Sequence, residues 1–449
     1  MKRRTFVRNT SLAGLGFSVA PGLSFGSRNN TEKLQIGLIG CGLRGQNHLE
    51  LLLKRSDVVI VALADPNEEM IERSLKMFDS NATVKPIIYN RGDYDYERML
   101  ETEDLDAVII ATPWEWHSKQ AIAAMNARVF VGLEVSGAFS VEECWDLVNT
   151  HLETKTPLYF LENVCFRRDI MAMLNLVREG LLGEMVHLEC GYQHDLRGVK
   201  FNDGVTPYNS GVELGDKGFS EAKWRTNHSI HRNGDLYPTH GIGPVSQFID
   251  VNRGNRLLTI SSMASKSRGL HDYIVNHEKG GENHPNAKIK FNLGDKVTSM
   301  ITTSNGETIV MHHDTNLPRP YSLGFRVQGT RGLWMKVNNS IYIEGMSPPH
   351  KWENDSPYLE KYDHKIWKEG LEKSVGAGHG GMDYFLMESF LDCAMNGSEI
   401  PFDVFDAATW MSLTPLSEAS IKEGGAVRYI PDFTNGLWIN RKNNFALNG

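Results

Sequence analysis

Cysteine is scarce in this sequence and follows no recognisable spacing. The 449 residues contain five cysteines, at positions 41, 144, 165, 190 and 393, an odd number spread over the whole chain. No C-x-x-C pair occurs among them. The sequence therefore indicates neither a disulfide framework nor a cysteine-based zinc site.

Net positive charge and long apolar runs are also lacking. Lys and Arg total 47 against 55 Asp and Glu, which gives a formal net charge of −8 at pH 7. Nucleic acids and anionic membranes are bound through a basic face, so we expect no nucleic-acid partner. No apolar run reaches the roughly 18 residues of a transmembrane helix, so no membrane span is predicted. With 41% hydrophobic residues, the composition is that of a globular protein long enough for two domains.

The first 30 residues have the layout of an export signal. A basic start leads into a weakly apolar stretch rich in Gly, Ala and Ser, and Arg3 and Arg4 followed by Phe6 resemble a bacterial twin-arginine signal. The alternative interpretation is a basic tail. We expect residues 1–30 to be a signal peptide and the protein to be exported to the periplasm. The twin-arginine route carries folded proteins, so a cofactor could be loaded in the cytoplasm.

Between residues 31 and 163 the sequence alternates between apolar strands and amphipathic helices. Apolar runs such as LQIGLIG and VVIVALAD are separated by segments with helical spacing, such as GQNHLELLLKRS and HSKQAIAAMNA. Strands that are apolar throughout and alternate with helices are typical of a parallel, doubly wound sheet. The sequence therefore predicts an α/β protein in which residues 31–163 form an N-terminal Rossmann domain.

The pattern changes after residue 163. A helix and a strand lead into a polar stretch rich in Gly and Asn, and β segments follow between residues 256 and 343. Asn305-Gly306, between two alternating segments, is a strong hairpin signal. Helical patterns return after residue 379. Residues 164–449 are therefore expected to form an α+β domain for substrate binding, with a large, mostly antiparallel open sheet and helices returning at the C-terminus.

A glycine-rich loop follows the first predicted strand, in QIGLIGCGLRGQNH. Gly40, Gly42 and Gly45 form G-x-G-x-x-G, and Asp65 ends the next strand 20 residues after Gly45. The first glycine allows a tight turn, the second lets the backbone approach a pyrophosphate, and the third lets helix and strand pack closely. Asp65 would bond the ribose hydroxyls and repel a 2′-phosphate, so NAD is favoured over NADP. Arg44 is expected at the pyrophosphate or ribose side of the cofactor.

Three further predicted strands end in polar or aromatic residues. The strand in IIATPWEWH leads into Trp114 to His117, and the next two strands end at Glu134-Val135 and at Asn163. Ligands of open parallel sheets bind beyond the carboxyl ends of the strands. We therefore expect these residues to lie on one rim, with Trp114 to His117 beside the nicotinamide ribose.

The glycine loop, the ATP-x-x-x-H strand end and the strand end at Glu134 resemble the glucose–fructose oxidoreductase/inositol dehydrogenase superfamily. The resemblance covers nearly all of the chain after residue 30. Most dehydrogenases of that superfamily carry E-K-P at this last position, with the lysine acting in proton transfer at the sugar hydroxyl. Here the triplet is Glu134-Val135-Ser136. The missing lysine argues against simple alcohol dehydrogenation by the usual residues.

A closer resemblance rests on the segments TPWEWH, GLEVSGA, ECGYQHDLR, AKWRTNHSIHRNGDLYPTHGIGP and GHGGMD. Together they resemble the family 109 glycoside hydrolases, which are NAD-dependent α-N-acetylgalactosaminidases and commonly carry a twin-arginine signal. The resemblance implies cofactor contacts at Leu43, Arg44, Asp65, Trp114, Glu115, Trp116, His117, Glu134, Val135 and Asn163. It implies substrate contacts at Tyr192, Arg225, Tyr237, Pro238, Thr239, His240 and Tyr321.

The chemistry implied by this resemblance explains a glycosidase with a dinucleotide. Ordinary glycosidases need two carboxylates that flank the scissile bond, and no such pair stands out here. In the NAD route, hydride leaves sugar C3 for the nicotinamide, and the resulting ketone acidifies the C2 proton. A base removes that proton, the group at C1 is eliminated, water adds, and the same NADH returns the hydride to C3. A tightly bound, recycled NAD suits export to a compartment without free NAD.

The proton-transfer groups must be His or Tyr if the lysine is absent. His240 occupies the position of the superfamily's active-site histidine. The Asp that often precedes it by four residues is replaced by Leu236, with Asp235 one step away. Tyr192 and His194 alternate on a predicted strand and so point to one face. We therefore expect the catalytic residues among His240, Tyr192, His194 and Tyr237.

Other interpretations stay open at the level of sequence. His228 and His231, with His240, could be metal ligands, but nothing fixes a third ligand and its partners, so no metal is predicted. His379, in a glycine turn, could reach the cleft. Rival functions are an NAD-dependent sugar oxidoreductase and a non-catalytic sugar-binding protein that keeps NAD. A glycan or small sugar is the expected partner. The superfamily commonly pairs subunits, which allows a homo-oligomer, but the oligomeric state stays open, as do the preferred sugar, its linkage, the C2 base and the signal cleavage point.

Overall fold

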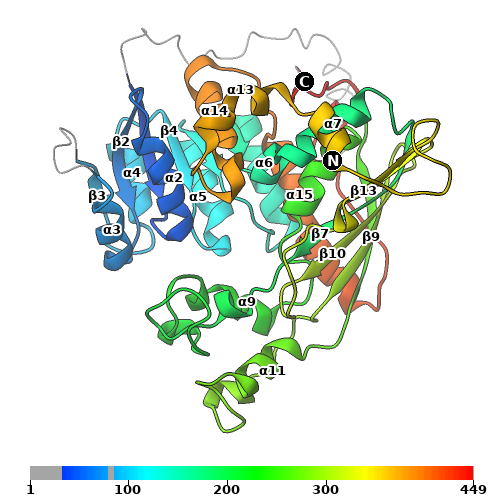
Figure 1. Ribbon diagram of the computed structural model, residues 1–449. Coiled ribbons are helices and arrows are strands. Elements are labelled where there is room, and N and C mark those ends of the chain that lie inside the picture. Colours follow the sequence, from blue (N-terminus) through cyan, green and yellow to red (C-terminus); the bar gives the residue numbers. More distant parts are fainter. Residues whose placement is uncertain (1–32, 79–84, 448–449) are drawn as a thin grey trace, which may run out of the picture.

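The computed structural model describes residues 33–78 and 85–447 (Figure 1), so the predicted signal peptide lies outside the described residues. Two β-sheets follow one another along the chain, and helices from both parts of the chain cover the first sheet. Within the described ranges, no helix is both long and apolar enough to cross a bilayer.

Six parallel strands form the first sheet, in the order β3-β2-β1-β4-β5-β6. Chain order reverses between β1 and β4, so the loops that follow these two strands open into one crevice. The predicted doubly wound Rossmann sheet is confirmed. Its strands are β1 (Leu34–Ile39), β2 (Val58–Ala64), β3 (Ile87–Tyr89), β4 (Ala107–Ile110), β5 (Phe130–Leu133) and β6 (Leu158–Phe160). Its helices are α2 (Leu43–Leu53), α3 (Glu68–Leu75), α4 (Asp95–Thr102), α5 (Trp114–Asn126) and α6 (Val141–Thr154).

Nine strands form the second sheet, in the order β14-β13-β12-β11-β7-β10-β9-β8-β15. Only the β7–β10 pair runs parallel, so the expected large, mostly antiparallel sheet is confirmed. The turn at Asn305-Gly306 joins β9 to β10, as the hairpin signal predicted. The strands are β7 (Met185–Gln193), β8 (Leu257–Ala264), β9 (Val297–Thr303), β10 (Thr308–Asp314), β11 (Arg326–Gly329), β12 (Gly332–Met335), β13 (Ser340–Ile343), β14 (Glu353–Asn354) and β15 (Arg428–Tyr429).

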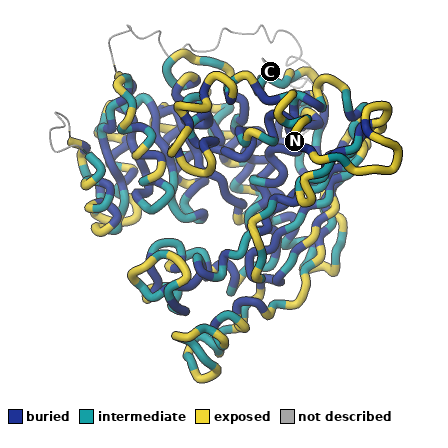
Figure 2. The backbone as a smooth tube through the Cα atoms, in the orientation of Figure 1, coloured by how far each residue is buried: buried dark blue, intermediate teal, exposed yellow. Residues whose placement is uncertain are grey.

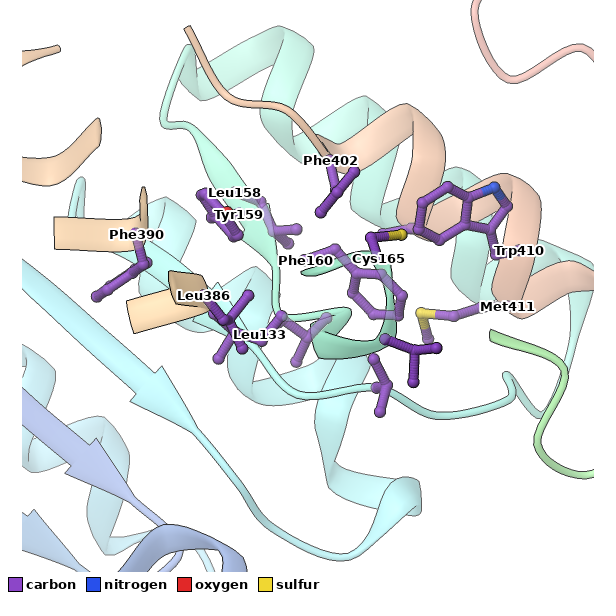
Figure 3. Packing of buried hydrophobic residues seen from close by; sticks show 14 of the residues in the cluster. Leu133, Leu158, Tyr159, Phe160, Cys165, Leu386, Phe390, Phe402, Trp410 and Met411 are labelled. Atoms are coloured by element: carbon purple, nitrogen blue, oxygen red, sulfur yellow. The ribbon is translucent and has the colours of Figure 1, made fainter. Parts of the chain in front are cut away.

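The C-terminal helices return to the first sheet. α14 (Met382–Asn396) brings Phe390 against β5 and β6, and α15 (Val404–Lys422) brings Trp410 close to Phe160 (Figure 3). A Cβ on Gly132 of β5 would lie 2.8 Å from the Phe390 ring, so glycine is what lets α14 pack this closely. This packing carries the first turn of α14 to the edge of the glycine loop. α10 (Thr239–Phe248) packs on β7, on η1 (Asn163–Phe166) and on α7 (Arg168–Arg178), whereas α12 (Ser356–Lys361) packs on α7 and α13 (Lys365–Ser374) packs on α14.

An extension leaves one end of the second sheet and lies beneath the first domain in the view of Figure 1. It carries α8 (Arg197–Lys200), η3 (Ser220–Lys223), α9 (Arg225–His231) and α11 (Gly269–Asn276). It has a small core of its own, formed by Phe201, Val212, Leu270 and Ile274. Figure 2 shows exposed segments at the tips of the extension, whereas the strands of the first sheet are largely buried.

Candidate active site

The glycine loop turns sharply between β1 and α2. Gly40 has a φ of +93°, which favours glycine, and a Cβ on Gly45 would lie 2.0 Å from the Gly40 carbonyl oxygen. A Cβ on Gly42 would meet nothing within 4 Å. Gly42 is also the N-cap of α2, with no side chain bonded to the first N–H groups of the helix. The loop thus combines a tight turn, close packing and open backbone donors, which is the geometry that binds a pyrophosphate.

A cavity of about 350 Å³ begins at this loop and extends to the second domain. Of the residues predicted to bind cofactor, it is lined by Gly40, Gly42, Leu43, Arg44, Asp65, Trp114, Trp116, His117, Glu134 and Val135. Arg225 and Tyr237, predicted to bind substrate, line the same cavity. Its walls also include residues that sequence reasoning did not single out, namely Asn67, Met70, Tyr89, Asp93, Tyr96, Ser220, Glu221, Lys223 and Trp224.

Asp65 lies at the end of β2 with its carboxylate fixed by backbone donors. Asp65 Oδ2 accepts a hydrogen bond from the Cys41 N–H at 2.7 Å, and Oδ1 accepts one from the Asn67 N–H at 2.8 Å. Burial raises the pKa of Asp65 above its usual value, although these two hydrogen bonds oppose the shift. The carboxylate therefore ties the glycine loop to the next strand while one side of the residue lines the cavity.

Trp114 to His117 form the first turn of α5 rather than an extended strand end. His117 is buried, with Nε2 2.8 Å from the Thr112 carbonyl oxygen and Nδ1 3.1 Å from Ser136 Oγ, so its ring is held as part of the cavity floor. Glu115 does not line the cavity; its Oε2 lies 3.5 Å from His228 Nε2. Pro113 is the N-cap of α5, a position where the missing N–H of proline costs no helical hydrogen bond.

Arg44 and His48, one turn apart on α2, converge on the buried Glu134. Arg44 Nε donates to Glu134 Oε1 at 2.6 Å, and His48 Nε2 lies 2.7 Å from the same oxygen. Burial alone would raise the pKa of Glu134, but Arg44 and His48 hold it well below its usual range. The Val135 N–H donates to Glu134 Oε2 at 3.0 Å, which fixes the carboxylate. His48 was not identified from sequence, although it lies on the same helical face as Arg44.

The other side of Arg44 is paired with Asp383, in the first turn of α14. Arg44 donates to the two Asp383 oxygens at 2.7 and 3.3 Å. Asn163 Nδ2 donates to Asp383 Oδ1 at 2.7 Å, and His379 Nδ1 lies 2.7 Å from Oδ2. Asn163 therefore binds this carboxylate and does not line the cavity. His379 belongs to the same network, at the loop end of α14.

The predicted substrate and proton-transfer residues gather beside the inner end of the cavity. Tyr192, Tyr237 and His240 form a triangle with ring centroids 4.7, 4.9 and 5.6 Å apart, and His194 and Tyr321 extend it with centroids 4.9 Å apart. We call these five residues the Tyr–His cluster. Tyr192 OH lies 3.0 Å from His194 Nδ1, so these two alternate residues at the end of β7 point to the same side. Burial raises the pKa of Tyr192 and Tyr237, and it lowers the pKa of His194.

His240 is held by a carboxylate that sequence reasoning missed. It follows Pro238 and Thr239 at the start of α10, and Nδ1 lies 2.8 Å from Oε1 of Glu162. Glu162 has no exposed surface and its Oε1 also accepts the Val164 N–H at 3.0 Å. Asp235, the alternative raised by the sequence, instead accepts the Tyr237 N–H at 3.1 Å. Glu162 lies two residues beyond β6, the strand next to β5, which Glu134 follows; this position just past a strand end is the signal that could have identified it.

α10 approaches the second sheet closely because Gly241 has no side chain. A Cβ there would lie 2.7 Å from the Gly191 nitrogen of β7. His240 precedes Gly241 on α10, and Tyr192 follows Gly191 on β7. The close approach therefore places the His240 ring beside the Tyr192 ring. Thr239, at the start of α10, is buried.

Arg225 is enclosed by aromatic rings at the junction of the two domains. Its guanidinium lies 4.8 Å from the Trp114 ring centroid, 5.2 Å from that of Trp224 and 5.6 Å from that of Tyr237. Arg225 Nε is 2.5 Å from Glu221 Oε2. Burial would lower the pKa of Arg225, but Glu221 and the neighbouring phenols raise it overall. A fixed cation at this position is suited to bind hydroxyl or carbonyl oxygens of a ligand.

The residues present fit a dinucleotide better than a metal. The open Gly42 backbone, the unsatisfied N–H groups of α2 and the carboxylate of Asp65 along one wall match the pyrophosphate and ribose of NAD. Across residues 33–78 and 85–447, no group of three His, Cys, Asp or Glu side chains is arranged to hold a metal ion. His228 stacks on Trp114 with centroids 5.1 Å apart, and His231 is exposed.

Comparison with known proteins gives two family matches along the chain. Residues 34–160 match an oxidoreductase family with an NAD-binding Rossmann fold, and residues 166–440 match the C-terminal domain of glycosyl hydrolase 109. Relatives include an alpha-N-acetylgalactosaminidase of Tannerella forsythia, 51% identical over 99% of both chains. A second, of Shewanella oneidensis, is 35% identical over 97% of this chain and 94% of the relative.

Solved structures share the fold at low identity. Levoglucosan dehydrogenase, in complex with NADH and levoglucosan, has a TM-score of 0.62 at 16% identity and covers 89% of this chain and 100% of its own. An oxidoreductase of Agrobacterium radiobacter, in complex with NAD+, L-tartaric acid and magnesium, has a TM-score of 0.58 at 16% identity and covers 89% and 98%. Both confirm a fold made of a Rossmann domain followed by an open sheet.

Proposed function

Because the chain belongs to the glycosyl hydrolase 109 family, we propose that it removes terminal α-linked N-acetylgalactosamine from glycans with a retained NAD. The observation that carries this proposal is the continuity of the site. The cavity at the glycine loop runs to Arg225 and Tyr237, and Tyr237 is also a member of the Tyr–His cluster. A dinucleotide and a sugar can therefore meet at one place.

NAD, when bound, supplies a hydride acceptor for sugar C3 and returns the same hydride at the end of the cycle. Gly42 and the first N–H groups of α2 would hold its pyrophosphate, and Asp65 its ribose. Oxidation at C3 makes the C2 proton acidic, so the chain has to supply a base for that proton. It also has to supply an acid for the oxygen that leaves C1.

His240 is suited to be the base at C2. The buried Glu162 carboxylate can only accept a hydrogen bond, which assigns the proton to Nδ1 and leaves Nε2 with a free lone pair. The same carboxylate stabilises the imidazolium that forms when Nε2 takes the proton. Glu162 therefore both orients the His240 ring and stabilises the positive charge that His240 acquires.

Tyr192 and His194 form a second proton-transfer pair. Because burial raises the pKa of Tyr192, its hydroxyl stays protonated at neutral pH and can donate to the leaving oxygen at C1. The phenolate that remains can take a proton back from the water that adds to C1, and His194, whose Nδ1 lies 3.0 Å from the phenolic oxygen, holds that oxygen in place. Arg225, Tyr237 and Tyr321 would bind hydroxyl or acetamido groups of the sugar.

The test uses the purified chain with 4-nitrophenyl α-N-acetylgalactosaminide in deuterated water and no added NAD. We expect nitrophenol release, deuterium at C2 of the product sugar and no net NADH. Steady NADH formation from free sugar when NAD is supplied, with no nitrophenol release, would indicate a sugar oxidoreductase. Sugar binding with neither reaction would indicate a non-catalytic protein.

We also propose export by the twin-arginine route with NAD already bound, and assembly into a homo-oligomer. The support for export is the basic start with Arg3, Arg4 and Phe6. Replacing both arginines by lysine should leave the protein in the cytoplasm, which cell fractionation would measure. Light scattering on the purified chain would give the number of subunits.

A further inference from the structure

A segment of the second domain completes the wall of the dinucleotide cavity. Residues 201–224, which we call the cap segment, belong to the extension, yet Ser220, Glu221, Lys223 and Trp224 line the cavity together with Asp65 of the first domain. The proposed chemistry uses Arg225, which follows this segment, but no side chain of the segment itself. Its position therefore calls for a separate role.

The cap segment touches the first domain at α3. The guanidinium of Arg73 lies 4.9 Å from the centroid of the Phe219 ring, and Phe219 is buried. Asn202 fixes the backbone at this contact, because its Oδ1 accepts the Phe219 N–H at 2.9 Å and its Nδ2 donates to the Phe219 carbonyl at 2.8 Å. Arg73 lies one turn beyond Met70, which lines the cavity. This contact therefore holds the cap segment at the end of the cavity next to Asp65.

The cap segment touches the first domain a second time at α5. The Trp224 and Trp114 ring centroids lie 5.1 Å apart. Contacts to α3 and to α5 hold the segment on two sides of the cavity. A ligand in the cavity is thus bordered by the glycine loop on one side and by the cap segment on another.

The charges along the cavity show which residue of the cap segment is available to an anion. Arg44, beside the glycine loop, is already paired with Glu134 and Asp383. Arg225 is paired with Glu221. Lys223 is exposed and lines the cavity, and among residues 33–78 and 85–447 no carboxylate oxygen lies within 4.0 Å of its Nζ. A dinucleotide brings a doubly charged pyrophosphate, and Lys223 is the cation of this wall whose charge is not already neutralised.

We propose that the cap segment retains the cofactor, with Lys223 pairing with a phosphate and the Phe219–Arg73 contact holding the segment against α3. The inference rests on the proposed function, because it assumes that the ligand of the cavity is NAD. Release of NAD then requires the cap segment to separate from α3 and the Lys223 pair to break. Retention of one NAD over many turnovers follows from that requirement.

The test measures release of NAD from the full chain rather than activity. Holoenzyme loaded with isotope-labelled NAD is mixed with excess unlabelled NAD, and bound label is followed by rapid filtration. We expect Lys223→Met to release NAD about tenfold faster and Arg73→Met about threefold faster, as for a partly shielded phosphate pair and a single cation–π contact. Both side chains are at the surface, so both variants should fold, and thermal unfolding without NAD would verify this.

Matched controls separate retention from general effects of charge. Lys217→Met removes the same charge from an exposed position of the cap segment outside the cavity wall, and Glu69→Gln removes the ion-pair partner of Arg73 while leaving the ring contact. Both should release NAD at the wild-type rate. If Lys223→Met and Arg73→Met also match the wild-type rate, the retention proposal is wrong while the proposed function stands. If the wild-type chain binds no NAD, both fail together.

Discussion

Replacing Glu162 with glutamine tests whether His240 is a base that depends on a buried carboxylate. Glu162 has no exposed surface, and glutamine is nearly the same shape, so the packing around η1 and α10 should persist. The amide oxygen can still accept the Val164 N–H. The substitution removes the negative charge 2.8 Å from His240 Nδ1. The imidazole is also no longer held with its proton on Nδ1, because an amide can donate to Nδ1 as well as accept from it.

The size of the effect follows from that single contact. A hydrogen bond to a charged partner contributes about 1.5–3 kcal/mol, and here it is present most strongly when His240 is protonated in the transition state. Its loss should lower kcat by about 10- to 150-fold. Glu162 does not line the cavity, so KM should change by less than about threefold.

The assay follows nitrophenol release from substrate that carries either hydrogen or deuterium at C2. Weakening the base makes proton removal slower relative to the other steps, so the C2 isotope effect on kcat should increase in Glu162→Gln. Glu162→Asp, which keeps the charge at a greater distance, should lie between the variant and the wild type. A purely structural role would lower kcat without changing the isotope effect.

Asp235→Asn is the matched control for a buried carboxylate near the same helix. Burial raises the pKa of Asp235 to about 7, and its carboxyl accepts the Tyr237 N–H rather than contacting His240. We expect less than about a threefold change in kcat, because an amide oxygen can accept that hydrogen bond. A Glu162→Gln variant that matches the wild type in kcat and isotope effect would refute the assignment of His240.

Two further predictions concern the network and the loop beside the cavity. Asp383→Asn should lower the free energy of unfolding at pH 7 by about 2–3 kcal/mol, measured by urea titration. This loss is smaller than that expected for a buried charge left wholly unpaired, because Glu134 still pairs with Arg44. Burial would raise the pKa of Asp383, but Arg44 and His379 hold it far below its usual range. A carboxyl whose pKa is lowered in the folded state stabilises the fold above its unfolded pKa of about 4, and this stabilisation is lost on acidification. The free energy of unfolding should therefore fall more steeply below about pH 5 in the wild type than in Asp383→Asn. Gly42→Ala should keep the wild-type Tm without NAD, because nothing lies within 4 Å of the new Cβ, yet weaken NAD binding about tenfold. Gly45→Ala should lower the Tm itself, because its Cβ would lie 2.0 Å from a carbonyl oxygen; equal Tm values for the two variants would contradict this account.

The glycine loop was predictable because its constraints are local. Gly40, Gly42 and Gly45 act on a turn of six residues, and the apolar strands on either side fix where that turn lies. The same holds for Tyr192 and His194, which alternate at the end of β7 and lie within hydrogen-bond distance. Patterns of this kind depend only on residues that are close in the sequence, so the sequence alone predicts them.

The partners of the site residues were not predictable in the same way. Glu162 and His240 are 78 residues apart, and Arg44 and Asp383 are 339 apart. Each pair forms only because α10 packs on β7 and α14 packs on β5. A carboxylate at a strand end is a weak signal by itself, since it gives the edge of the sheet but not the side chain that it will meet.

The two networks differ in what they do for the site. Glu162 meets His240 beside the Tyr–His cluster, where a proton must move, and a buried carboxylate there stabilises a charge that appears and disappears. At the glycine loop, Arg44 pairs with Glu134 and Asp383, and no charge has to appear or disappear there during the reaction. These ion pairs connect α2 to the end of β5 and to α14. A cofactor that is to be recycled needs both arrangements at once, because the sugar must change while the dinucleotide stays. The cap segment contacts Arg73 and Trp114 of the first domain. In the retention proposal it is the part of the chain that keeps the dinucleotide bound while sugars are exchanged.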